Sequence, residues 1–93
     1  MAIKPEKIAA ILRNEDIEGL IALGAPADEY DSEAEKIAKT IAGWPAGELT
    51  QANISALIAL LWAKSFNRTA QEIEQRMPAF MHISKNILAS VGL

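Results

Sequence analysis

The stretch GAPADEYDSEAE at residues 24–35 ends one helix and starts another. Its glycine and proline stop any preceding helix, because glycine suits the left-handed helix end and the residue before proline avoids helical geometry. Ser32 and Glu35 fit a capping box, in which a hydroxyl and a carboxylate accept backbone N–H groups at a helix start. Asp31 is an equally good cap. The spacing predicts a helix over residues 32–42.

Apolar residues at helical spacing precede this stretch as well. Pro5 suits the first turn of a helix, and the apolar stripe behind it ends near Asn14. Residues 16–23 repeat the spacing over barely two turns, which predicts a short helix or a helical turn.

Two further helical segments follow it. Thr50 is a suitable cap for a strongly apolar helix that ends near residue 66. Thr69 and Glu72 form a second capping box, for a segment that continues to residue 90. Pro78 interrupts that segment and predicts either two helices or one kinked helix. No alternating strand pattern occurs, so the sequence predicts an all-α fold, a compact bundle of four to five short helices in a single domain over residues 1–93.

The composition of the chain excludes several classes of protein. The chain has no cysteine, which excludes disulfides and thiolate metal sites and favours a reducing compartment. Its N-terminus lacks the pattern of a secretory signal, and its longest nearly uncharged run, of about fifteen residues, is shorter than a membrane span. We therefore expect a soluble cytoplasmic protein that does not contact a membrane.

The acidic residues are concentrated in one segment. Between residues 14 and 35 there are eight of the twelve acids and no base, so a local charge near −8 lies beside a remainder near +5. Clustered carboxylates produce a local field that speeds encounter with a basic partner and repels nucleic acid. The sequence therefore predicts a possible basic protein partner and no nucleic-acid binding. The acids are Glu15, Asp16, Glu18, Asp28, Glu29, Asp31, Glu33 and Glu35.

The acidic turn, residues 28–35, is the candidate partner-binding surface. Its candidate contact residues are Asp28, Glu29, Tyr30, Asp31 and Glu33. An exposed Tyr30 could anchor an interface, because tyrosine buries a large area and keeps a polar tip; alternatively its ring packs on the edge of the core. The acids could instead only complement the positive end of a helix dipole.

The same carboxylates permit a second interpretation, a divalent-cation-binding protein or enzyme. Asp28, Glu29, Asp31 and Glu33 offer hard oxygen ligands, but their spacing does not match a calcium-binding loop. His82 is the only histidine and would have to form a nitrogen site alone. No nucleophile with a paired base occurs, so we predict no catalytic residue, no metal ligand set and no cofactor.

The third helical segment is apolar on more than one side. Trp62 lies in the apolar stripe and is expected in the core; alternatively, Leu60 and Trp62 could extend into a subunit interface, which makes a homodimer possible.

Residues 24–34, with the pattern G-x-P-x-D-E-Y-x-x-E-A, and Arg76-Met77-Pro78-Ala79-Phe80 resemble a family of small uncharacterised bacterial helical proteins, classed as a domain of unknown function. The resemblance spans most of the chain. It implies an all-helical fold and a bacterial source, but no activity and no catalytic residue. A protein-interaction module is the favoured function, comparable to the small acidic immunity proteins that cap nuclease toxins.

Overall fold

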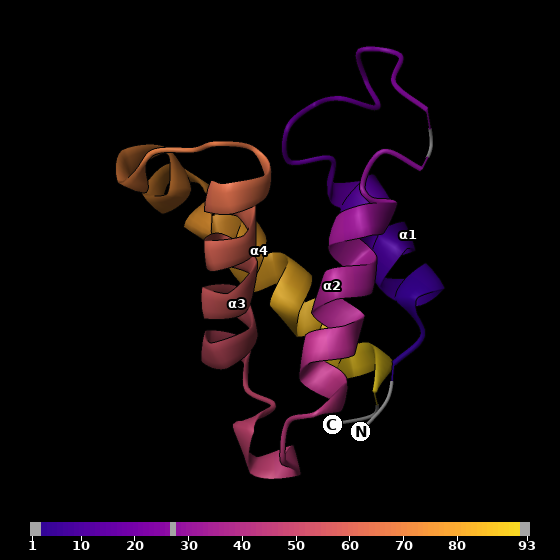
Figure 1. Cartoon of the computed structure of the whole chain (residues 1–93), viewed down its shortest axis with the longest axis vertical. Helices are drawn as coiled ribbons and strands as arrows, with labels where there is room; N and C mark the ends of the chain where they lie inside the picture. The colour runs from indigo at the N-terminus through magenta and orange to yellow at the C-terminus, as the bar shows by residue number, and fades with distance from the viewer. Residues whose placement is uncertain (1–2, 27, 92–93) are drawn as a thin grey trace.

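The computed structural model describes residues 3–26 and 28–91, and in these residues it contains helices and no strand (Figure 1). The molecule measures 36 × 27 × 18 Å along its principal axes. The predicted all-α compact bundle is confirmed. The elements are α1 (Pro5–Glu15), α2 (Asp31–Ala42), the short 3₁₀ helix η1 (Ala46–Glu48), α3 (Gln51–Ser65) and α4 (Ala70–Ser90).

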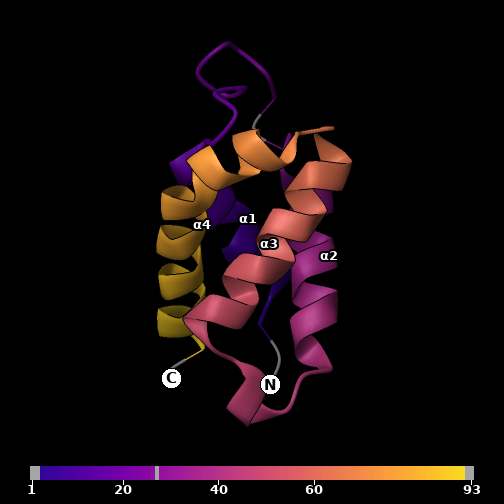
Figure 2. The same cartoon turned by 90° about the vertical axis from the view of Figure 1, so that its left-hand side faces the viewer.

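The four α-helices share one hydrophobic core. Helix α1 packs against α2, α3 packs against α4, and α1 also contacts α4 (Figures 1 and 2). Each helix contributes its apolar stripe to this core, as the spacing in the sequence predicts. None of the helices in the described residues has the length and apolarity needed to cross a membrane. The fully buried core side chains include Ile8, Leu12, Ile37, Ile41, Ile54, Ile58, Trp62, Phe80, Ile83 and Ile87.

Between α1 and α2 lies the connecting segment, residues 16–26 and 28–30, which extends beyond one end of the helices (Figure 1). It consists of turns, so of the two predicted alternatives the helical turn is the correct one. Asp16 adopts a left-handed conformation with φ of 44° and ends α1. Its carboxylate then accepts the backbone N–H groups of Ile21 and Ala22, at 3.1 and 3.0 Å, in place of continued helical hydrogen bonds.

The start of α2 differs from the prediction. The residue before the helix is Tyr30, whose carbonyl accepts the N–H of Ala34, and no side chain caps this helix start. The predicted capping box of Ser32 and Glu35 is therefore wrong, as is the cap at Asp31. The reason is that the cap position is taken by Tyr30, a tyrosine held in the core, so Asp31 and Ser32 are the first two residues of the helix and lie inside its first turn.

The caps of the other two helices agree with the sequence. Thr50 Oγ1 accepts the N–H of Asn53 at 3.1 Å. At the start of α4, Thr69 Oγ1 accepts the N–H of Glu72 at 3.2 Å, while Glu72 Oε1 accepts the N–H of Thr69 at 2.9 Å, which completes the predicted capping box. Pro78 lies inside α4, which remains one helix and bends between its first and second parts (Figure 2).

Candidate functional site

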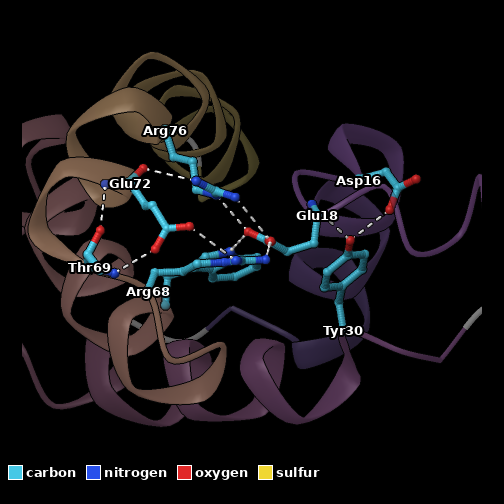
Figure 3. A network of polar contacts seen from close by, with 8 residues as sticks. Asp16, Glu18, Tyr30, Arg68, Thr69, Glu72 and Arg76 are labelled. Atoms are coloured by element: carbon cyan, nitrogen blue, oxygen red, sulfur yellow. Dashed lines mark hydrogen bonds and ion pairs between the residues drawn. The ribbon is translucent and has the colours of Figure 1, made fainter.

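Tyr30 fixes the end of the connecting segment to the core. Its hydroxyl donates to Asp16 Oδ1 at 2.7 Å and accepts the N–H of Glu18 at 3.2 Å (Figure 3). Its ring stacks on Trp62 with a centroid distance of 5.9 Å and lies 6.2 Å from the ring of Phe66. The beginning and the end of the segment are thus joined by one side chain.

Glu18 connects the same segment to α3 and α4. Its side chain is only 2% exposed. One carboxylate oxygen accepts Trp62 Nε1–H at 2.8 Å and Arg76 Nε–H at 2.8 Å, and the other accepts hydrogen bonds from Arg68 and Arg76 (Figure 3). Charged hydrogen bonds of this kind are stronger than neutral ones. We call Asp16, Glu18, Tyr30, Trp62, Arg68 and Arg76 the Glu18 cluster.

The first turns of α4 orient the two arginines of the cluster. Arg68 lies just before the helix and donates to Glu72 Oε2 at 3.3 Å, while Arg76 donates to the carbonyl of Glu72 at 3.0 Å (Figure 3). Glu72 is itself held by the capping box with Thr69. The helix start therefore also positions the guanidinium groups that bind Glu18.

Electrostatics stabilise the ionised form of both acids in the cluster. Burial alone raises the pKa of Glu18, but hydrogen bonds from Arg76, Trp62 and Arg68 outweigh burial and lower it below its usual range. The hydrogen bond from Tyr30 lowers the pKa of Asp16. Burial, and then the hydrogen bond to Asp16, raise the pKa of Tyr30 to about 12. At neutral pH the cluster therefore contains two carboxylates and a neutral phenol.

These properties suit an anchor and not an acid–base catalyst. A general acid or base needs a pKa near the working pH and access to substrate, whereas Glu18 is ionised, buried and surrounded by donors. The cluster instead fixes the position of the connecting segment relative to the helices.

The five predicted contact residues do not share one surface. Asp28, Glu29 and Asp31 are exposed. Tyr30 is 1% exposed, so the interpretation of this residue as an exposed anchor is wrong, and the alternative, in which its ring packs on the core, is correct. Glu33 is 8% exposed, and its buried Oε2 finds no hydrogen-bond donor in the described part of the chain. Both side chains turn inward because α2 buries this face against the core.

The carboxylates of the acidic turn also do not gather as a metal site. Across residues 3–26 and 28–91, no three Asp, Glu or His side chains are grouped so that they could hold an ion. Asp31 and Glu35 of α2 line a small cavity of about 70 Å³ together with Glu6 of α1.

The residues that sequence reasoning missed are the basic members of the cluster. Glu18 counted as one of eight clustered acids, whereas its partners Arg68 and Arg76 lie 50 and 58 positions away. The only signal in the sequence was the imbalance between an acidic segment and a basic remainder, which indicates that some of these charges pair. Of the eight acids, Asp16 and Glu18 are used inside the fold, and Glu15 of α1 also makes a long-range contact, with its Oε1 at 2.6 Å from Nδ1 of His82 in α4.

Comparison with known proteins gives no relative for this chain. No protein-family model, no curated protein and no solved structure matches it. The family resemblance carried by residues 24–34 therefore stays a prediction.

Proposed function

We propose that this chain is a protein-interaction module whose exposed carboxylates Asp28, Glu29 and Asp31 bind a basic surface of a partner protein. The observation that carries the proposal is that these acids flank Tyr30, the residue by which the connecting segment is anchored in the core. The carboxylates are thus exposed on a turn whose backbone is held in place.

Anchoring matters because disorder lowers affinity. A binding loop that must become ordered loses conformational entropy on binding, and a loop that is already fixed avoids much of this cost. In the acidic turn, Glu29 donates its N–H to the carbonyl of Pro26 at 3.1 Å, and Asp31 donates to the carbonyl of Asp28 at 3.0 Å. Two backbone turns and the buried Tyr30 therefore preorganise these acids.

The connecting segment also offers an apolar contact. Leu23 is 83% exposed, more than the exposed apolar side chains of Leu60 and Met81. Interfaces combine a few apolar anchors with surrounding polar groups. In this proposal Leu23 is the exposed interface anchor, the role that the sequence suggested for Tyr30. Its side chain is apolar and lies close in the chain to the acids.

The wider setting of the proposal comes from the sequence. The absence of cysteine favours a cytoplasmic location, the family resemblance favours a bacterial source, and the acidity suits an immunity-like role against a basic protein such as a nuclease toxin. A divalent-cation function gains no support from the described residues, which contain no suitable ligand group.

The test is affinity capture from a bacterial lysate with quantitative mass spectrometry, using three baits. The first is the wild type, and the second is Asp28→Lys/Glu29→Lys, which changes the formal net charge from −3 to +1. Asp31 is left unchanged because a lysine there would oppose the dipole of α2. The third bait, a control, makes the same change of charge on exposed positions of α4 beyond its first turn, as Glu74→Lys/Gln75→Lys/Ala89→Lys.

We expect a basic protein that the wild type and the control retain and that the Asp28/Glu29 variant loses. Binding should also weaken as salt rises above physiological ionic strength, because the contact is electrostatic. If all three baits retain the same proteins, or if retention does not depend on salt, the acidic turn is not the binding surface.

A further inference from the structure

Helix α3 has a second apolar face that the bundle does not cover. Its inner face, with Ile54, Ile58 and Trp62, is fully buried. On the outer side Leu60 is 76% exposed, and it lines an open groove of about 430 Å³. The groove residues come from α3, the end of η1 and the loop after α2, and they are Trp44, Glu48, Asn53, Ala56, Leu57 and Leu60.

This groove lies along a stripe of the helix. Asn53, Leu57, Leu60 and Lys64 follow one another at intervals of four, three and four residues, which places them on one side of an α-helix. The stripe spans about 16 Å at 1.5 Å per residue. A helix that is apolar on both sides is typical of a helix buried on both sides. The outer stripe therefore suits a partner surface of matching length.

The two ends of the stripe carry opposite charges. At its beginning, Asn53 Nδ2 donates to Glu48 Oε2 at 3.1 Å and to the Glu48 carbonyl at 2.9 Å, which holds that acid beside the first turn of α3. At its end, Lys64 is exposed in the last turn, and it makes no ion pair within residues 3–26 and 28–91. The middle of the stripe is apolar.

We propose that the occupant of this groove is a second copy of the chain, with the two α3 helices packed antiparallel about a two-fold axis. A surface that is negative at one end, apolar in the middle and positive at the other end is complementary to itself when one copy is reversed. The axis then passes between Leu57 and Leu60. Leu57 lies against the partner subunit's Leu60, and Lys64 lies against the partner subunit's Asn53 and Glu48.

Charge selects this arrangement over its alternatives. A parallel pair of α3 helices would place Lys64 beside the partner subunit's Lys64, and like charges at an interface are costly. A basic partner would fit Glu48 but would meet Lys64 at the other end of the same stripe, and an acidic partner would meet the reverse conflict. Trp44 at the edge of the groove supplies the kind of aromatic residue that contributes strongly to interfaces.

The structure also revises the sequence-based interface. Leu60 stays in it, but Trp62 cannot contribute, because its side chain is fully buried and its Nε1–H is bound to Glu18. The new interface consists of the stripe and the groove residues. It shares no residue with the acidic turn, so the two proposals can fail separately.

The test is sedimentation equilibrium of the purified chain over a range of concentrations. We expect the wild type to approach the mass of a dimer. Leu60→Glu should raise the dissociation constant at least about tenfold, since apolar residues at the centre of an interface carry much of its affinity. Leu23→Glu is the matched control, because Leu23 is a similarly exposed leucine outside the groove. It should leave the dissociation constant unchanged.

A charge exchange tests the antiparallel arrangement. Glu48→Lys and Lys64→Glu should each weaken the dimer, and the double variant should recover most of the lost affinity because it restores opposite charges across the axis. Far-ultraviolet circular dichroism checks that each variant is folded. A wild type that stays monomeric up to about 1 mM overturns the proposal. So does a folded Leu60→Glu variant that dimerises as the wild type does, or a double variant weaker than both single ones.

Discussion

Replacing Glu18 with glutamine tests whether the Glu18 cluster holds the fold together. The substitution keeps the shape of the side chain and removes its charge, so Arg76 loses its carboxylate partner and Arg68 keeps only Glu72. Breaking a fully buried ion pair costs about 3–5 kcal/mol. Arg68 and Arg76 are 32% and 22% exposed, so water compensates them in part, and we expect a loss of about 2–3 kcal/mol.

That loss is a large part of the stability of a chain of this size. Domains are stable by about 0.05–0.15 kcal/mol per residue, which is roughly 5–14 kcal/mol here. For domains of 60–100 residues, 1 kcal/mol shifts Tm by about 4–8 °C, so Tm should fall by roughly 8–24 °C. Urea unfolding gives the free energy of unfolding and heating gives Tm, and both can be followed by circular dichroism and tryptophan fluorescence. Trp62 reports directly on the cluster through its hydrogen bond to Glu18.

Glu29→Gln is the matched control, because it makes the same chemical change on an exposed acid of the acidic turn. It should leave Tm unchanged. If Glu18→Gln also leaves Tm within about 2 °C of the wild type, well below the shift expected for even 1 kcal/mol, the cluster does not stabilise the fold, and the anchored turn on which the proposed function rests loses its basis.

Three further predictions follow from the cluster and the caps. Tyr30 is the only tyrosine, so the ultraviolet absorbance of tyrosinate reports its ionisation alone, which should occur near pH 12. The contribution of Tyr30 to the free energy of unfolding should be complete below pH 10 and should be lost as the pH rises through about 12. The folded-state pKa of Glu18 lies below 4.5, so its contribution is complete above pH 4.5 and is lost as pH falls through the lowered value; Glu18→Gln should flatten the acid side of a plot of unfolding free energy against pH. Thr69→Ala removes the cap of α4 and should cost about 1 kcal/mol in urea unfolding, whereas Thr40→Ala, which loses only an exposed bond to the carbonyl of Lys36, should cost clearly less.

Local patterns in the sequence predicted most of the fold. Thr50 and Thr69 act as caps because a hydroxyl at a helix start needs only the N–H three residues later. Ser32 meets the same sequence rule and does not cap, because the burial of Tyr30 sets where α2 begins. A long-range contact thus overrides a local preference at the start of α2.

The candidate site was less predictable, because it depends on which charges meet in space. Asp28 and Glu29 were correctly expected on the surface, but Glu18 belongs to the same acidic run and its side chain is only 2% exposed. Sequence spacing cannot separate them, since the partners of Glu18 lie in α3 and around the start of α4. Likewise, Leu60 and Trp62 are two residues apart on one helix, and only the packing of that helix shows which of them faces outward.

The long sequence separation of the Glu18 contacts has a consequence for folding kinetics. The partners of Glu18 lie 44, 50 and 58 residues further along the chain, whereas the turns and caps of each helix join near neighbours. Distant contacts require a large loop to close and tend to form late. Contacts that are absent from the transition state act on the rate of unfolding and leave the folding rate nearly unchanged. We therefore expect Glu18→Gln to raise the unfolding rate and to leave the refolding rate close to that of the wild type. The cluster thus determines the lifetime of the native state.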